Sequence, residues 1–160
     1  MKSKCALLTI NDLSNFQSYD NLIVKPLKDL GWECEFVPWD STSVNWDDFD
    51  AVIIRSTWDY QQKENLFSRT LQLIEASSAT LYNSLDTVKW NINKRYLLEL
   101  EKENISIIPT RLYDSFDFEI VSQLFSFFNE NKLVIKPCVS ANADDTFILE
   151  QSKMESLKFD

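Results

Sequence analysis

A polar and aromatic run, Arg55–Tyr60, directly follows the short apolar segment Ala51–Ile54. Arginine can hold a carboxylate with two parallel hydrogen bonds, and flat aromatic rings exclude water from a small ligand. Ligands of open parallel sheets bind beyond the carboxyl ends of the strands, and Asn11 and Asp12 follow another apolar run in the same way. The predicted substrate-binding residues are Asn11, Asp12, Arg55, Ser56, Thr57, Trp58, Asp59 and Tyr60. The alternative is that Arg55–Tyr60 only packs a loop against the next helix.

Two lysines are candidates for binding phosphate. Lys136 ends the apolar run Leu133–Ile135 and precedes Pro137, so a rigid strand would hold its ammonium group in one place. The alternative for Lys136 is an edge-strand lysine that discourages aggregation. Lys94 lies on the polar side of an expected helix, and taken alone it is typical of a solvated lysine.

The composition excludes several kinds of chemistry. The chain has no histidine, which excludes histidine triads and imidazole zinc sites. Its one glycine, Gly31, cannot build a Rossmann or Walker loop. The net charge of −9 argues against nucleic acid as a partner, because nucleic-acid-binding proteins usually carry a basic face. The acidic turn at 47–50 lacks the glycine and glutamate of a calcium loop, and we assign no catalytic residue and no metal ligand in this chain.

The cysteines and the amino terminus indicate a compartment. Cys5, Cys34 and Cys138 are odd in number and widely separated, which is typical of buried thiols in a reducing environment. The apolar run after the basic residues 1–4 is too short for a signal peptide, and a membrane helix needs about 20 residues. We expect a cytoplasmic protein that has no membrane partner.

The first half of the chain alternates expected strands and helices. Apolar runs predict strands at 5–10, 33–39, 51–54 and 81–83. Helical spacing predicts one helix from Phe16 to Leu30, which Pro26 should kink or split, and another around 66–74. This β-α-β-β-α-β order predicts a small α/β layer with a mainly parallel sheet.

The second half changes character at 84–86, where we place a domain junction, so the predicted domains are 1–84 and 85–160. Its pattern predicts a helix from Asp86 to Leu100, a strand at 106–112, a helix at 120–128 and strands at 132–137 and 146–149. A polar loop, 141–145, joins the last two strands, and 153–160 resembles the start of a helix. This half is therefore expected to be α+β.

Several segments together resemble one family. The strings are Val52–Tyr60, Trp90–Asn91, Asn93–Leu98, Ile108–Thr110, Val134–Pro137 and Val139–Ala141. In this order and spacing they resemble ATP-grasp ligases, and most closely the subgroup of the cycloserine-forming cyclo-ligase and the glutathione-synthetase-like enzymes. The resemblance implies a pre-ATP-grasp α/β substrate domain at 1–84, followed by a linking helix and an incomplete first ATP-grasp subdomain at 85–160.

The resemblance also implies a reaction and roles for residues. Such enzymes use ATP and Mg²⁺ to activate a carboxylate as an acylphosphate, which an amine then attacks. Lys94 would contact the nucleotide phosphates, Lys136 would contact phosphate and the adenine region, and Arg55–Tyr60 would line the substrate side. The flexible lid over the phosphates would include Ser140, Asp145 and Thr146. Charge neutralisation and positioning by lysines and magnesium suit phosphoryl transfer without histidine.

Two departures from the family shape the expected activity. The lid reads Ala-Asn-Ala-Asp-Asp at 141–145, where the family is often glycine-rich. The family's adenine hinge and magnesium-binding carboxylates would lie after Asp160. We therefore expect the amino-terminal part of a ligase that is inactive alone, and we expect uncovered apolar surface around Phe125, Phe128 and Phe147 to favour self-association.

Two other functions stay open. The first is a non-catalytic nucleotide- or ligand-binding module that kept the fold without the metal site. The second, a phosphorylated receiver domain, would need an aspartate at the end of the third strand, where Arg55 stands.

Overall fold

The computed structural model describes the backbone of residues 2–156 and the side-chain surroundings of residues 2–154. It divides into two compact units, whose boundary lies between Trp90 and Asn91. Residues 157–160 of the helix expected at 153–160 lie outside the described residues. None of the helices in the described part of the chain has the length and apolar character needed to cross a membrane.

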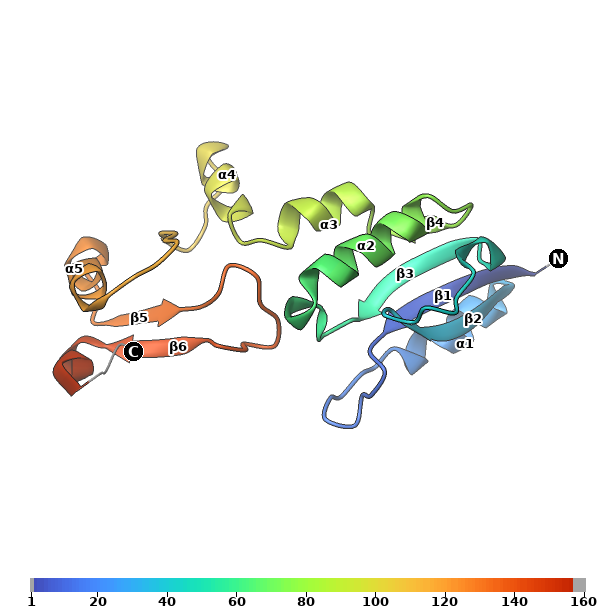
Figure 1. Ribbon diagram of the computed structural model, residues 1–160, viewed down its shortest axis with the longest axis horizontal. Coiled ribbons are helices and arrows are strands. Elements are labelled where there is room, and N and C mark those ends of the chain that lie inside the picture. The colour runs from blue at the N-terminus through green and yellow to red at the C-terminus, as the bar shows by residue number, and fades with distance from the viewer. Residues whose placement is uncertain (1, 157–160) are drawn as a thin grey trace. The chain divides into compact units, whose positions relative to one another are not determined.

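The first unit is built on a four-stranded sheet, shown in Figure 1. Its strands are β1 (Ser3–Thr9), β2 (Trp32–Pro38), β3 (Ala51–Ser56) and β4 (Thr80–Tyr82). They lie in the order β2-β1-β3-β4, and every neighbouring pair is parallel. The predicted α/β class with a mainly parallel sheet is confirmed.

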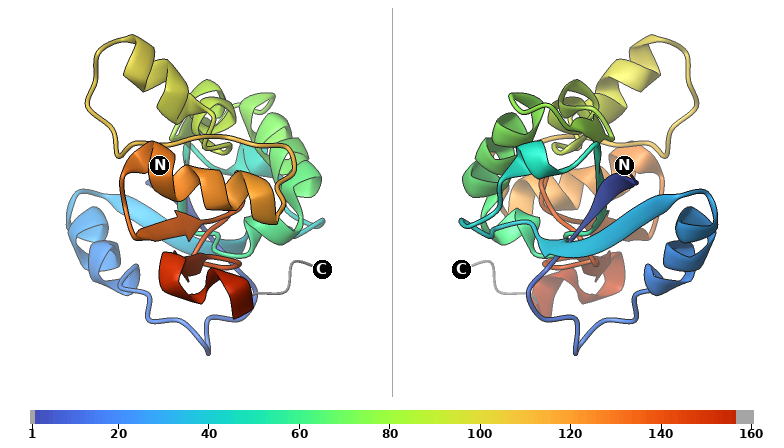
Figure 2. Two further views of the ribbon diagram at one scale, coloured as in Figure 1. Left: turned by 90° about the vertical axis from the view of Figure 1, so that its left-hand side faces the viewer. Right: turned by 90° about the vertical axis from the view of Figure 1, so that its right-hand side faces the viewer.

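Two helices cover this sheet on opposite faces, α1 (Asn21–Asp29) and α2 (Glu64–Glu75) (Figures 1 and 2). Apolar side chains on both faces of the sheet are buried beneath these helices. Strands with continuous apolar sequences are typical of a sheet that is covered on both faces. The α1 face is formed by Cys5, Leu7 and Ala51 packed against Ile23 and Val24. On α2, the buried stripe is Phe67, Thr70, Leu71 and Ile74, which the helical spacing predicts.

The helix expected at 16–30 is shorter than predicted, because α1 begins at Asn21. A local turn precedes it, in which the backbone N–H of Ser14 donates to Asp12 Oδ1 at 2.8 Å. Pro26 lies inside α1 and does not split the helix. Gly31 has a φ of 91°, and this left-handed backbone ends the helix before β2.

Short 3-10 helices complete the connections: η1 (Trp46–Asp48), η2 (Tyr60–Gln62) and η3 (Gln151–Ser156). In the acidic turn after β2, η1 buries Trp46, and the neighbouring Phe49 is also buried. These two rings pack the turn against the core, and Asp47 and Asp50 accept the backbone N–H groups of Ser78 and Lys4, at 2.8 and 2.7 Å.

The second unit contains an antiparallel strand pair, β5 (Lys132–Ile135) and β6 (Phe147–Glu150). The helix α5 (Phe118–Phe128) packs on one face of this pair (Figure 2). The small core consists of Val121, Phe125 and Met154 with Leu133, Ile135 and Leu149 around them. Phe125 is therefore buried, which corrects the expectation of an uncovered surface there, whereas Phe147 is 58% exposed and Phe128 is half-buried.

The helix expected from Asp86 to Leu100 is two helices, α3 (Leu85–Asn91) and α4 (Tyr96–Lys102). Non-local and local hydrogen bonds break it. The backbone N–H of Lys94 donates to the carbonyl of Cys138 at 2.8 Å, and the backbone N–H of Arg95 donates to Asn93 Oδ1 at 3.0 Å. Neither amide is free to continue a helical ladder, so Lys94 lies in a turn and not on a helix.

The strand expected at 106–112 is not formed, and the backbone there is irregular. No strand of the described part of the chain pairs with this segment. Ile108 is 86% exposed, so burial supplies no reason for a strand either. The β-branched residues beside Pro109 produce a strand-like sequence pattern, but no neighbouring strand pairs with this segment in the described part of the chain.

Candidate functional site

The carboxyl end of β3 in the first unit is irregular where the sequence predicts substrate contacts. Leu8 of β1 pairs with Ile54, but the next residue, Thr9, pairs with Ser56. One residue of β3, Arg55, is therefore extra, as in a β-bulge, which re-aims side chains and is common beside functional sites. Arg55 and Ser56 belong to the strand itself, which was expected to end at Ile54.

Asp20, at the start of α1, collects hydrogen bonds from both residues at this bulge. Arg55 Nε donates to Asp20 Oδ1 at 2.8 Å, and Arg55 Nη2 lies 2.7 Å from the same oxygen. The hydroxyl of Ser56 donates to Asp20 Oδ2, and the hydroxyls of Ser18 and Ser56 lie 3.0 Å apart. The carboxylate therefore ties the end of β3 to the start of α1.

The environment of Asp20 favours its charged form. Burial by itself raises the pKa of the Asp20 carboxyl, but the hydrogen bonds from Ser56 and Arg55, together with the positive charge of Arg55, outweigh it. The pKa of Asp20 consequently lies below its ordinary value. The guanidinium of Arg55 remains partly open to solvent, with 41% of its side chain exposed.

A second polar cluster lies where β1 and β2 end. Asn11 donates to Asp40 Oδ1 at 2.7 Å, and Lys63 Nζ donates to Asp40 Oδ2 at 2.9 Å. Trp39 Nε1 donates to Asp59 Oδ1 at 2.6 Å. Asn11 and Asp59 thus lie at the predicted edge of the sheet, and both are engaged in holding its loops.

The remaining predicted substrate residues differ in what they offer. Thr57 is buried, and the ring of Tyr60 packs 5.2 Å from that of Phe67, so these two have structural partners. The ring of Trp58 lies 5.4 Å from that of Phe16. Asp12 accepts a hydrogen bond within its own turn. Arg55 is the one cation of the predicted set, and because 41% of its side chain is exposed, its charge could reach an anionic ligand.

Sequence reasoning missed Asp20, Asp40 and Lys63 in this region. Asp20 directly precedes an apolar helical pattern, which would suggest a helix cap. Its carboxylate makes no helix-capping hydrogen bond, however, and accepts a hydrogen bond from Arg55 instead. Asp40 and Lys63 follow β2 and precede α2, which is where parallel-sheet connections gather polar residues.

Lys94, in the second unit, is held closely by the segment after β5. Its Nζ donates to Ser140 Oγ at 2.7 Å and lies 3.3 Å from the carbonyl oxygen of Ser140 and 3.4 Å from that of Cys138. Since its backbone N–H also donates to Cys138, four contacts fix one lysine to two residues. Lys94 is half-buried.

Lys136 lies near enough to Lys94 to influence its charge. Burial lowers the pKa of Lys94 below its ordinary value, and the positive charge of Lys136 lowers it further. No ion pair between a carboxylate and either lysine occurs among the residues with described side chains. The second unit therefore brings two ammonium groups together without an anion beside them, and one of the two is exposed.

The loop that follows these lysines bends through left-handed backbone. Asn142, Ala143 and Asp145 have φ angles of 54°, 62° and 51°. This conformation favours glycine, and asparagine and aspartate tolerate it better than most residues. The Thr146 hydroxyl lies 3.4 Å from the carbonyl oxygen of Asp144, and Asp145 is exposed. The loop 141–145 therefore adopts backbone conformations that favour glycine, although it contains none.

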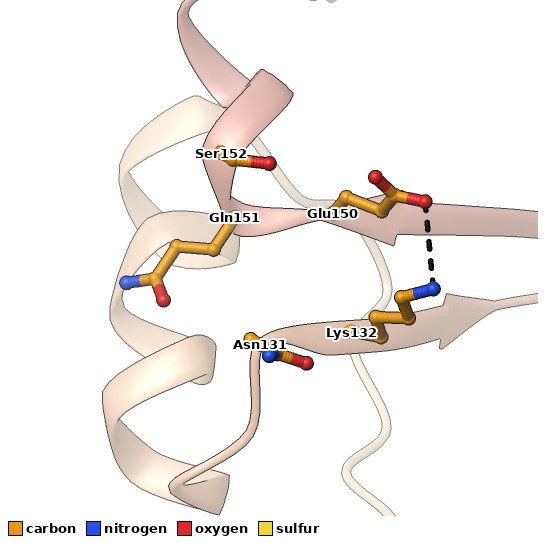
Figure 3. Close-up of a pocket in the computed structure, with 5 residues that line it drawn as sticks. All are labelled: Asn131, Lys132, Glu150, Gln151 and Ser152. Carbon is orange, nitrogen blue, oxygen red and sulfur yellow. Dashed lines mark ion pairs between the residues drawn. The ribbon is translucent and has the colours of Figure 1, made fainter.

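A pocket in the second unit lies away from the predicted residues. It has a volume of about 340 Å³ and is lined by Asn131, Lys132, Glu150, Gln151 and Ser152 (Figure 3). Lys132 and Glu150 form an ion pair of 3.6 Å across it. Lys132 begins β5, whereas Lys136 follows the end of that strand, so this pocket contains none of the predicted site residues.

Comparison with known proteins shows which sequences this chain resembles. Residues 5–83 match the family model described as D-cycloserine synthetase DcsG, N-terminal domain. The cycloserine biosynthesis protein DcsG of Streptomyces lavendulae is 26% identical over 88 residues, which are 55% of this chain and 29% of that protein.

Solved structures extend the likeness in fold over nearly the whole chain. The crystal structure of D-cycloserine synthetase DcsG matches with a TM-score of 0.83 and 24% identity, over 96% of this chain and 52% of that one. A RimK domain ATP-grasp protein from Sphaerobacter thermophilus matches with a TM-score of 0.70 and 17% identity, over 96% and 58%. The match thus spans little more than half of either structure. The predicted resemblance is confirmed: this chain is similar to the amino-terminal portion of ATP-grasp ligases of the cycloserine-forming kind.

Proposed function

We propose that this chain is the amino-terminal part of an ATP-dependent carboxylate–amine ligase, in which Lys94 and Lys136 bind the phosphates of ATP. One observation carries the proposal. Lys94 is partly desolvated beside a second lysine, and no carboxylate compensates the two charges among the described side chains.

Such a pair of like charges is unfavourable by itself and becomes favourable when an anion lies between them. An exposed lysine could turn into solvent to avoid its neighbour. Lys94 is prevented from doing so by its bonds to Ser140 and Cys138. The turn between α3 and α4 therefore holds a charge in place for a polyanion, and a nucleotide triphosphate matches that chemistry.

The first unit supplies a group for the second reactant. Arg55, at the carboxyl end of β3, is the proposed contact for the substrate carboxylate. The family resemblance implies a reaction in which the γ-phosphoryl group of ATP is transferred to a carboxylate oxygen with release of ADP, and attack of an amine on the carbonyl carbon then releases phosphate and a proton. The chain's own residues neutralise phosphate charge and orient the carboxylate, which is most of what phosphoryl transfer needs from a protein.

Magnesium has no assigned ligand in this chain. Within the described residues, no group of three or more His, Cys, Asp or Glu side chains could hold a metal ion. The family resemblance implies metal ligands in a part of those enzymes that the match does not include. We therefore propose that the 160-residue polypeptide binds nucleotide and does not by itself complete ligation.

Calorimetric titration of the 160-residue chain with MgATP tests the nucleotide site. We expect Lys94→Ala and Lys136→Ala each to weaken binding about tenfold or more, because each removes a charge-assisted contact to phosphate. Lys132→Ala is the matched control, since Lys132 begins β5, the strand that Lys136 follows, and pairs with Glu150. Equal affinity in all four proteins would refute the assignment.

The rival function, a binding module without catalysis, differs in turnover and not in binding. The measurement is ADP release in the presence of a carboxylate and an amine, by a protein in which this chain is extended to the full length of its relatives. Nucleotide binding without any carboxylate-dependent ADP release would favour the module.

A further inference from the structure

The guanidinium group of Arg55 has two edges that can bind a carboxylate, and the structure uses one of them. Nε and Nη2 form the first edge, and both contact Asp20 Oδ1, at 2.8 and 2.7 Å. Nη1 and the second hydrogen of Nη2 form the other edge. Among the described residues no hydrogen bond or ion pair to Nη1 occurs, and the side chain is 41% exposed.

The side chain of Asp20 is held in one conformation, so it can hold the guanidinium group of Arg55 in one orientation. Its side chain is 7% exposed, and Ser56 donates to its second oxygen. Its backbone N–H donates to Ser18 Oγ at 3.2 Å, and its position at the start of α1 anchors the main chain. The bulge at Arg55 and Ser56 allows two successive residues of β3 to reach the same carboxylate.

We infer that Asp20 is a positioning residue that presents the open edge of Arg55 to the carboxylate of the substrate. The inference rests on the proposed ligase function for the need to bind a carboxylate. The open edge offers two parallel N–H donors, which match the two oxygens of a carboxylate end-on. An arginine held on one side loses less side-chain freedom when it binds on the other.

A competing role for Asp20 makes the opposite prediction. If Asp20 only neutralises Arg55 and keeps the guanidinium occupied, its removal leaves a stronger free positive charge and improves anion binding. If Asp20 positions Arg55, its removal weakens carboxylate binding although the local positive charge rises. Truncation of this one side chain therefore separates the two roles by the sign of the change.

The test uses acetate as the carboxylate probe and acetamide, its neutral counterpart of similar shape, as the control. Both are titrated into the ¹⁵N-labelled 160-residue chain while the Nε–H resonance of Arg55 is followed by NMR. The resonance is assigned by its loss in Arg55→Lys. We expect acetate, and not acetamide, to shift this resonance in a saturable manner.

Two variants of Asp20 then give the decisive comparison. We expect Asp20→Ala to weaken acetate binding about tenfold, the loss expected for one well-formed bidentate contact. Asp20→Asn keeps an oxygen acceptor facing Arg55, so it should bind acetate within about twofold of the parent chain, and this rescue distinguishes positioning from charge. Acetate binding by Asp20→Ala that equals or exceeds that of the parent would overturn the inference.

A fold control keeps the result interpretable. Should Asp20→Ala not fold, Arg55→Lys is used instead and followed through backbone amides near β3. It keeps the positive charge but lacks the second edge of donors, so acetate binding should be lost. Retention of acetate binding in Arg55→Lys, or absence of a selective acetate shift in the parent chain, would refute the proposal that the open edge of Arg55 binds a carboxylate.

This test fails independently of the nucleotide assignment. Lys94 and Lys136 belong to the second unit, and Arg55 and Asp20 belong to the first. MgATP binding that persists in Asp20→Ala, alongside unchanged acetate binding, would reject the role of Asp20 and leave the nucleotide site standing. Loss of MgATP affinity in the lysine variants does not bear on whether Arg55 binds a carboxylate.

Discussion

Asp20 is a buried ionisable group and Lys94 a half-buried one, and their surroundings act on their charges in opposite ways. Asp20 is surrounded by donors from Ser56 and Arg55 that stabilise its charge. Lys94 is held by neutral oxygens and faces a second positive charge. Because an uncompensated buried charge costs free energy, whereas a compensated one contributes to folding, the first group supports the fold and the second is suited to a ligand.

Replacement of Asp20 by asparagine should change stability in a pH-dependent way. The folded-state pKa of Asp20 lies below its ordinary value, so its contribution is present above the unfolded pKa and is lost as pH falls through the folded one. We expect Asp20→Asn to be less stable by about 1 kcal/mol at neutral pH. The difference should shrink as the pH falls below about 4, the ordinary pKa of aspartate, and vanish once the pH lies below the folded-state pKa.

Urea unfolding of both proteins across this pH range measures the effect. Asp29→Asn is a suitable control, because Asp29 pairs with Lys25 on an exposed helix surface and should show little difference at any pH. A constant offset between Asp20→Asn and the parent chain at all pH values would contradict the argument.

Nucleotide binding should be linked to proton uptake at Lys94. Burial and Lys136 hold its pKa below the ordinary value, and a bound polyanion raises it again. At alkaline pH, between the lowered and the raised pKa, binding takes up a proton, and near neutral pH it takes up none. Calorimetry of MgATP in two buffers of different ionisation enthalpy measures this uptake. It should be absent in Lys94→Met, and uptake of equal size in that variant would assign the proton elsewhere.

Among the elements, the sheet and its two helices could be predicted because local periodicity and burial agree there. The four parallel strands follow continuous apolar runs, and α2 follows its stripe of apolar residues. Prediction failed where a distant partner decides the backbone. The break between α3 and α4 depends on Cys138, which lies 44 residues after Lys94. The network of Asp20 depends on a bulge, which no local pattern reveals.

Asn129 ends α5 with a left-handed backbone, at a φ of 54°. We expect Asn129→Ala to destabilise the second unit by about 1 kcal/mol, because alanine pays for this conformation and asparagine tolerates it. Asn129→Gly, the matched variant, should be neutral or slightly stabilising. Thermal unfolding followed by circular dichroism compares the three, and equal midpoints for alanine and glycine would refute the explanation.

At the scale of the whole molecule, the two units have separate cores of different sizes. The first has a sheet covered on both faces, whereas the second has one helix over two strands. The outer face of that strand pair exposes Val134 and Ile148, which are cross-strand partners. Exposed neighbouring apolar side chains favour association between molecules, which is our proposal for this polypeptide.

Light scattering over a range of protein concentrations tests this association. We expect the apparent mass to rise with concentration, and we expect Val134→Thr combined with Ile148→Thr to reduce that rise, because it removes apolar surface while keeping β-branched side chains. Leu30→Thr, at an exposed position of the first unit, is the control. A constant monomer mass in the unmodified chain would contradict the proposal.

The contact between Lys94 and Cys138 gives the proposed nucleotide site a chemical reporter of its own. Burial raises the pKa of the Cys5 thiol to about 11, and burial also raises the pKa of Cys34, so both should react slowly with alkylating reagents. Cys138 is half-buried and its carbonyl oxygen accepts the amide of Lys94. Iodoacetamide should therefore label Cys138 first, and bound MgATP should slow that labelling, which mass spectrometry can follow without any substitution in the chain.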